Sequence, residues 1–236
     1  MLFRSGDQDL CVVVSLPGLV ESLGLTLAGW SLGKRVAVLP PYLKDGELEH
    51  AISLLEPVLV VTDRPSSAAH SVALPDLIDS AGRAGSDLRL GRLQTFTSGT
   101  TGHPKCVDRP AGRLSDDIMQ FVETTGLVDT DRVTAMTTAL STTSVLPALV
   151  AGATLVSVPM RSPGSFWSSV TDGAVTVLSG TPYSYELAAR RTPDRSSLQT
   201  VRFGLSTSAR LRPCTARTIM ENTGRSEEHT SELQSH

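Results

Sequence analysis

A polar stretch with the sequence TFTSGTTGHPK, from Thr95 to Lys105, carries the residue types best suited to holding a phosphate group. Gly99 and Gly102 let successive backbone amides turn toward a ligand, and such amides form an anion-binding nest. Neighbouring hydroxyls add donors, and the lysine adds a mobile positive charge. The stretch therefore predicts a polyphosphate site. Its residues would be Thr97, Ser98, Gly99, Thr100, Thr101, Gly102 and Lys105.

This stretch is not a Walker A loop, because His103 and Pro104 separate Gly102 from Lys105. The alternative is a solvated turn rich in glycine, serine and threonine. The Pro-Lys pair, following directly after an apolar run, favours phosphate binding over that alternative. His103 is expected to be exposed, without a catalytic role.

The elements that would position this loop alternate between strand and helix. The sequence predicts strands at 10–16, 35–40, 58–63, 132–136, 153–158, 175–178 and 200–206, and one entering the loop. Helices are expected after Leu19, after a cap at Asp45, near 74–81 and along the face Leu114, Ile118, Phe121 and Val122. This order predicts an α/β fold with parallel sheets flanked by helices, in two lobes.

Composition narrows the class of protein. The chain has 236 residues, 40% of them hydrophobic, and a net charge of -3, which is typical of a globular protein. A mixed charge pattern with only five Phe and three Tyr argues against a nucleic-acid platform. Cys11, Cys106 and Cys214 form no CxxC pair, so we expect a reduced chain in the cytoplasm. The charge-free stretch 133–160 is long enough to span a membrane, but its proline, glycine and many hydroxyls favour a buried strand-helix-strand unit.

The two ends read as artificial. RSEEHTSELQSH, at 225–236, resembles the conceptual translation of a sequencing-library adapter, and the reverse complement of its first four codons encodes the Leu-Phe-Arg-Ser found at 2–5. We therefore expect 1–5 and 225–236 to be adapter-derived. The expected domain layout is a first α/β lobe at 6–90 and an incomplete second lobe with the phosphate loop at 91–224. A natural polar tail and a natural start are the alternative.

Several stretches together resemble the AMP-forming adenylate synthetases, which include acyl- and aryl-CoA synthetases, luciferases and peptide-synthetase adenylation domains. FTSGTTGHPK resembles their signature loop. The other stretches, in family order, are GKRVAVLPPYLKDGELEHAISLLEPVLVVTD (33–63), LVAGATLVSVP (149–159), VTVLSGTPYSYELA (175–188) and LQTVRFGLSTSARL (198–211). The resemblance covers most of 6–224, and the signature loop is its most specific part.

The resemblance implies a two-step ligase. A carboxylate attacks the α-phosphate of ATP to give an acyl-adenylate, and the thiol of CoA or of a carrier-protein phosphopantetheine then displaces AMP. The signature loop would hold the β- and γ-phosphates beside Mg²⁺, and Ser208 and Ala209 match positions near the adenine. The implied partners are a small carboxylic acid and an acyl-carrier protein, with no nucleic acid and no membrane span. The family's catalytic acid and lysine would lie beyond residue 224, so the fragment is expected to be inactive alone, with no metal ligands of its own.

Three departures from the family pattern stand out. Cys106 replaces a glycine and is interpreted as a small packed thiol rather than a nucleophile. Thr207 and Ser208 replace a Gly-Gly pair. No histidine stands in 137–145, where Ser141, Thr142 and Thr143 could line an acyl pocket or equally cap helices and strands.

Asp116 and Asp117 are interpreted as first-turn helix residues rather than metal ligands.

Two other functions remain open from the sequence. A non-catalytic nucleotide-binding relative of the same fold is suggested by the missing histidine and the Thr-Ser replacement. A generic α/β interaction domain with an accidental loop is the third. A ligase requires the downstream glutamate and lysine, and the first alternative does not.

Overall fold

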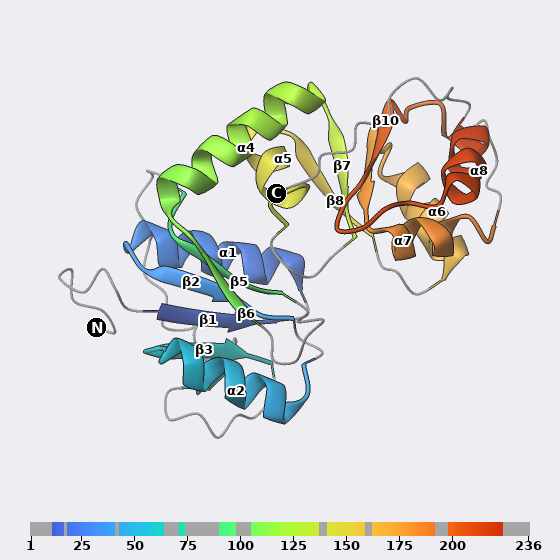
Figure 1. The fold of residues 1–236 in the computed structure, drawn as a ribbon. Coiled ribbons are helices and arrows are strands. Elements are labelled where there is room, and N and C mark those ends of the chain that lie inside the picture. Colours follow the sequence, from blue (N-terminus) through green and yellow to red (C-terminus); the bar gives the residue numbers. More distant parts are fainter. Residues whose placement is uncertain are drawn as a thin grey trace. The chain divides into compact units, whose positions relative to one another are not determined.

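The computed structural model describes residues 11–16, 18–40, 43–63, 71–73, 90–97, 105–136, 141–158, 162–191 and 198–223. The chain divides into two compact units, 1–120 with 138–140 and 121–137 with 141–236. Each unit is built around its own sheet (Figure 1). The boundary falls inside helix α4 (Ala111–Thr125), so the boundary expected before Gly91 lies within the first unit.

The first unit contains a six-stranded sheet with the order β4-β3-β1-β2-β5-β6. The first five strands in this order are parallel, and β6 runs antiparallel to β5. The elements are β1 (Cys11–Ser15), α1 (Leu19–Ser31), β2 (Arg35–Val38), α2 (Asp45–Leu55), β3 (Leu59–Thr62), β4 (Ser71–Ala73), β5 (Leu93–Thr97) and β6 (Lys105–Arg109).

Helices α1 and α2 cover opposite faces of this sheet (Figure 1). Side chains alternate along each strand, so neighbouring residues serve different helices. A Cβ at Gly29 of α1 would meet Val36, whereas Ala37 packs in the cluster that holds Leu48 and Ala51 of α2. Burial on both faces explains why these strands read as continuous apolar runs in the sequence.

The second unit contains a four-stranded parallel sheet with the order β10-β9-β7-β8. Its elements after α4 are β7 (Arg132–Ala135), α5 (Val145–Val150), β8 (Thr154–Ser157), α6 (Pro163–Asp172), β9 (Val177–Gly180), α7 (Pro182–Ala188), β10 (Phe203–Ser206) and α8 (Pro213–Thr223). The charge-free stretch 133–160 is therefore the predicted strand-helix-strand unit, formed by β7, α5 and β8. No helix among the described residues is long and apolar enough to cross a membrane.

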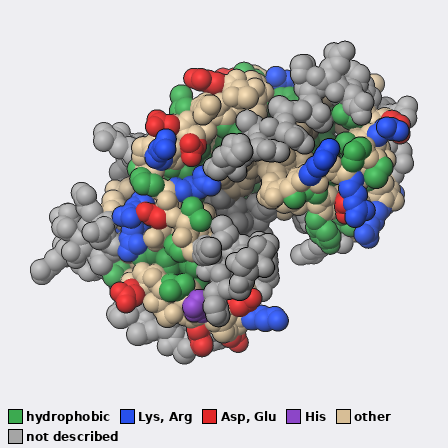
Figure 2. Space-filling view, in the orientation of Figure 1, with side chains coloured by type: hydrophobic (Ala, Val, Ile, Leu, Met, Phe, Trp, Pro, Cys, Tyr) green, Lys and Arg blue, Asp and Glu red, His purple; other side chains and the backbone are tan. Residues whose placement is uncertain are grey.

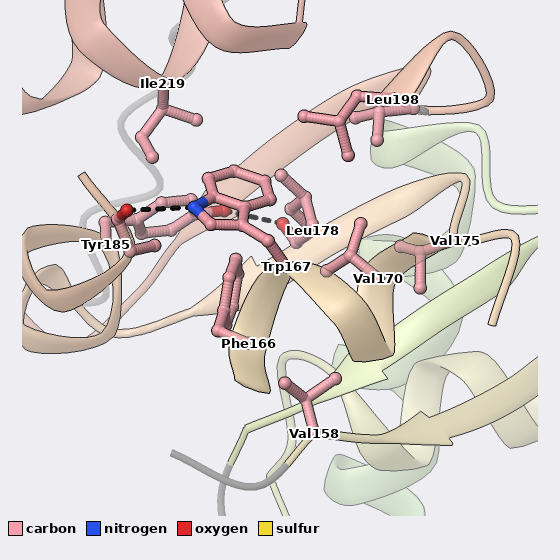
Figure 3. Close-up of a cluster of buried hydrophobic side chains, with 11 residues drawn as sticks. Val158, Phe166, Trp167, Val170, Val175, Leu178, Tyr185, Leu198 and Ile219 are labelled. Atoms are coloured by element: carbon pink, nitrogen blue, oxygen red, sulfur yellow. Dashed lines mark hydrogen bonds between the residues drawn. The ribbon is translucent and has the colours of Figure 1, made fainter. Parts of the chain in front are cut away.

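Two apolar clusters lie on opposite faces of this second sheet. Val177 packs with Phe121 of α4 and Ala148 of α5, and the next residue, Leu178, packs with residues of α6, α7 and α8. Figure 3 shows the second cluster, in which the Trp167 indole N–H donates to the carbonyl oxygen of Ala188 at 3.0 Å. Buried aromatic rings with satisfied polar atoms make this face a rigid support for β9 and β10.

Several local predictions need correction. The N-cap of α2 is Lys44, whose backbone N–H donates to the Glu47 carboxylate at 2.9 Å, and Asp45 is the first helical residue. Helix α4 begins at Ala111, so Asp116 and Asp117 lie beyond its first turn. The strand predicted at 175–178 begins at Val177. Val175 still belongs to the turn after α6, because its N–H donates to the Val170 carbonyl. The predicted helix near 74–81 lies outside the described residues.

Candidate functional site

The predicted phosphate loop connects two antiparallel strands. Strand β5 ends at Thr97, strand β6 begins at Lys105, and these two residues are direct partners in the ladder. Ser98, Gly99, Thr100, Thr101 and Gly102 lie between them, outside the described residues. Strand β6 is not predicted by the sequence patterns, which indicate a helix after the loop. The pairing brings the backbone of Lys105 beside the first residue of the predicted site, which the spacing in the sequence alone does not require.

The base of this hairpin is anchored in the first unit. Leu93 is fully buried, and Gln94 accepts a hydrogen bond from the Cys11 thiol at 3.4 Å. The Arg92 guanidinium donates through Nε to both carboxylate oxygens of Asp108, at 2.8 Å each. The Trp30 indole N–H donates to the Arg92 carbonyl at 3.2 Å. These contacts anchor the hairpin in the first unit at the end opposite the predicted loop.

Cys106 has an exposed side chain, which corrects the interpretation of a packed thiol. Partial burial and the nearby Asp108 carboxylate raise the pKa of the Cys106 thiol. Since the thiolate is the reactive form, a raised pKa disfavours a nucleophilic role. Burial also raises the pKa of Cys11 to about 11.

The predicted adenine-side residues follow β10, at the carboxyl end of the second sheet. Ligands of open α/β sheets bind at this edge. The Thr207 N–H donates to the Gly180 carbonyl at 3.0 Å and extends the pairing of β10 with β9. Ser208 then has φ of +77°, a left-handed conformation that glycine adopts without strain. Ser208 and Ala209 are both exposed. The Thr-Ser replacement therefore keeps a turn suited to glycine.

Gly180 and Thr181 lie at the same edge and are not among the site residues predicted from the sequence. The Thr181 hydroxyl caps α7 by accepting from the Ser184 N–H at 3.3 Å. A Cβ at Gly180 would lie 2.4 Å from the Met136 sulfur. The signal that could have found them is the run SGTP directly after an apolar strand, where a strand ends and a Thr-Pro pair starts a helix.

Ser141, Thr142 and Thr143 are half-buried in the turn before α5. The Ser141 hydroxyl accepts from the Thr143 N–H at 3.2 Å and lies 3.0 Å from the Thr143 hydroxyl. The Ser141 carbonyl accepts from the Leu146 N–H at 3.1 Å. These bonds are local to the turn, and the N-cap of α5 is Ser144, so capping by Ser141 or Thr143 and lining of an acyl pocket both stay predictions.

Among the described residues, no group of three or more His, Cys, Asp or Glu side chains lies close enough together to hold a metal ion. Asp117 instead lies 3.6 Å from the Arg109 guanidinium. On the face drawn in Figure 2, acidic and basic side chains are interspersed over the described surface. The phosphate loop and the Ser208 turn belong to different compact units.

Comparison with known proteins gives three findings. A family model described as "AMP-binding enzyme" matches residues 93–231, more than half of the chain, beginning at the first residue of β5. Feruloyl-CoA synthases of Amycolatopsis sp. and Streptomyces sp. are each 27% identical over 224 residues. That alignment covers 85% of this chain and 44% of each relative, so the chain spans less than half the length of the curated relatives it matches.

Solved structures share the fold. O-succinylbenzoate coenzyme A synthetase (MenE) from Bacillus subtilis, in complex with AMP, matches with a TM-score of 0.78 at 18% identity, over 94% of this chain and 60% of that one. ATP-bound MatB from Rhodopseudomonas palustris matches with a TM-score of 0.79 at 24% identity, over 94% and 49%. The α/β architecture, the signature loop and the family-model match agree. The chain belongs to the AMP-binding enzyme family, the AMP-forming adenylate synthetases.

Proposed function

We propose that this chain carries the nucleotide-binding part of an ATP-dependent, AMP-forming acid–thiol ligase. The observation that supports this most directly is the signature sequence 97–105, which joins two strands with a buried, hydrogen-bonded base in a chain of the AMP-binding family. Thr97, Ser98, Gly99, Thr100, Thr101, Gly102 and Lys105 would bind the β- and γ-phosphates. Ser208 and Ala209 would lie against the adenine.

In the proposed reaction a carboxylate oxygen of the acid attacks the α-phosphorus of ATP. The bond from that phosphorus to the bridging oxygen breaks, and pyrophosphate leaves with both bonding electrons. The thiol of CoA or phosphopantetheine then attacks the acyl carbon, loses its proton, and AMP leaves. Such transfers depend mainly on positioning and on neutralising phosphate charge. Mg²⁺ would help to neutralise the phosphate charge beside the signature loop.

The acid remains to be identified, and the relatives suggest where to begin. The curated relatives are named feruloyl-CoA synthases, so an aromatic acid of the ferulate type is the first substrate to test. Ser141, Thr142 and Thr143 would lie near the acid. Hydroxyls in that turn offer uncharged hydrogen-bond partners rather than a counter-charge. A cytoplasmic setting and a carrier-protein partner belong to the same proposal.

The test is nucleotide binding to the purified chain, measured by isothermal titration with ATP and with pyrophosphate. Lys105→Met is expected to lower the affinity for both ATP and pyrophosphate about tenfold or more, because one charge-assisted contact is lost. Lys44→Met is the matched control, since Lys44 is exposed at the start of α2. Equal affinities for the two variants would contradict the phosphate site.

Turnover is expected only in a longer protein that contains this chain. The chain alone should show no ATP–pyrophosphate exchange with ferulate, and detectable exchange would refute that expectation. A non-catalytic nucleotide-binding relative is the second candidate, favoured by the strained Ser208 where glycine would be relaxed. Binding without turnover in the longer protein would support this second candidate.

A further inference from the structure

We infer that Arg202 is a positioning residue for the nucleotide site, acting through the Asp131 carboxylate at the opposite end of the sheet. The pair would set the register of β10, and β10 carries the Thr207–Ala209 turn at its other end. This inference rests on the proposed adenine contact of Ser208 and Ala209. Its basis is the way the four strands of the second unit are tied together.

Strand β10 needs such a device. Among the described strands it pairs with β9 alone, at the edge of the sheet. Phe203 and Leu205 are only partly buried, and Gly204 and Ser206 are exposed. Partial burial of one face specifies the register of this edge strand less strongly than full burial specifies that of the inner strands. A slip of two residues would move the turn roughly 6–7 Å along the strand direction.

Asp131 joins the amino ends of all four strands. It directly precedes β7, and its carbonyl accepts from the Thr154 N–H of β8 at 2.9 Å. Its carboxylate accepts from the Thr176 hydroxyl, just before β9, at 2.6 Å. Arg202, just before β10, donates through Nη1 to both carboxylate oxygens at 2.6 and 2.7 Å. The Arg202 N–H also donates to the Thr176 carbonyl at 2.6 Å.

The two partners of this contact differ in burial. The Asp131 side chain is 1% exposed and is therefore held in place by its surroundings, whereas the Arg202 side chain is 44% exposed and reaches it from the surface. The Val128 N–H also donates to the carboxylate, at 3.0 Å. A buried carboxylate that loses its cation is costly, so the strand end that carries the cation is held in place.

The far end of β10 is held differently. The Tyr185 hydroxyl lies within hydrogen-bonding distance of the Leu178 carbonyl, at 2.6 Å, and of the Leu205 carbonyl, at 3.1 Å (Figure 3 shows the first). A neutral hydroxyl shared between two carbonyls tolerates displacement better than a charged, two-oxygen contact. Arg202 is therefore the stronger determinant of where Thr207, Ser208 and Ala209 lie.

The experiment measures AMP and pyrophosphate affinity of the purified chain for wild type, Arg202→Met and Arg202→Lys. Arg202→Met should lower the affinity for AMP about tenfold, because one hydrogen bond to the nucleotide is misplaced. The affinity for pyrophosphate should stay unchanged. Arg202→Lys, which keeps a cationic donor, should recover part of the loss. Val170→Ala is the control, because it removes buried volume from α6 and leaves every hydrogen bond between Arg202, Asp131 and Thr176 in place. It should leave AMP affinity unchanged.

Amide hydrogen exchange provides a second measurement. Exchange at Thr207, whose N–H donates to Gly180, should accelerate in Arg202→Met and not in Val170→Ala. Equal effects of the two variants on AMP, or an unchanged AMP affinity in Arg202→Met, would overturn the inference. A wild-type chain that binds pyrophosphate but not AMP would overturn the adenine contact and this inference with it. A chain that binds neither ligand would overturn the proposed function itself.

Discussion

The Thr134 hydroxyl forms hydrogen bonds with both backbone polar groups of Ser179, which a neighbouring strand would ordinarily satisfy with its own backbone. Its hydroxyl donates to the Ser179 carbonyl at 3.0 Å and accepts from the Ser179 N–H at 2.7 Å. Strands β7 and β9 pair through their backbones at Val133 and Val177. At Thr134 and Ser179, further along the same strands, the buried Thr134 hydroxyl bridges them instead. Two buried backbone groups of the central strand pair thus depend on one threonine.

Thr134→Val should therefore destabilise the chain by about 2–4 kcal/mol, because valine keeps the shape and leaves two buried polar groups unpaired. The change in free energy of unfolding can be measured by urea titration. Thr154→Val is the control, since the Thr154 side chain is exposed at the start of β8 and should change stability by less than about 0.5 kcal/mol. Similar costs for the two variants would contradict the bridging role.

Ser208→Gly should stabilise the chain by roughly 0.5–1 kcal/mol. Its φ of +77° strains any residue with a Cβ, and the relief exceeds the entropy that glycine adds to the unfolded chain. Ser206→Gly, in the extended strand two residues earlier, should instead destabilise by about 0.5–1 kcal/mol. Thermal unfolding of both variants gives the comparison, and the same sign in both would argue against strain at Ser208.

The Asp131 carboxylate should make stability fall at acidic pH. Burial pushes its pKa up, but hydrogen bonds from Thr176, Arg202 and Val128 outweigh burial and hold the pKa below the ordinary aspartate value. A lowered folded-state pKa means that the stabilisation is complete above the unfolded value of about 4 and is lost as the pH falls through the folded value.

Asp131→Asn tests this dependence. Urea unfolding of wild type and the variant should show a gap at pH 7 that narrows at pH 3, because pH 3 lies below the unfolded-state pKa of about 4, so the unfolded chain binds a proton that the folded carboxylate resists. The other carboxylates titrate in both proteins, so they cancel in the comparison. A gap that stays constant or widens toward pH 3 would contradict the ion pair with Arg202 as its source.

Thiol labelling should separate the three cysteines. Cys214 and Cys106 are exposed and Cys11 is buried. With the pKa of Cys11 raised to about 11, only about one thiol in a thousand is ionised at pH 8, and the thiolate is the reactive form. Maleimide at pH 8 should label Cys214 first, Cys106 more slowly because its pKa is also raised, and Cys11 only on unfolding. Peptide mass mapping measures this order, and early labelling of Cys11 would refute the buried site.

Much of the fold was predictable because its signals are local. The strands around Val13, Ala37 and Val60 are continuous apolar runs, and the face Leu114, Ile118 and Phe121 repeats at helical spacing, so each segment states its own structure. The α/β class followed from the order of these segments, and the family from the resemblance of the signature loop and four further stretches. Strand β6 escaped prediction because KCVDR is short and half polar, and only pairing with β5 makes it a strand.

The amino-acid sequence by itself determined the chemistry available to this protein: hydroxyls, glycines and a lysine at 97–105, and a serine in place of glycine at 208. Only the tertiary structure decided which groups meet. Thr134 and Ser179 are 45 residues apart and Asp131 and Arg202 are 71 apart, and nothing in their immediate neighbours marks them as partners. Such pairs form because burying the sheet leaves polar groups that must find one another, and that requirement arises only when distant segments pack together.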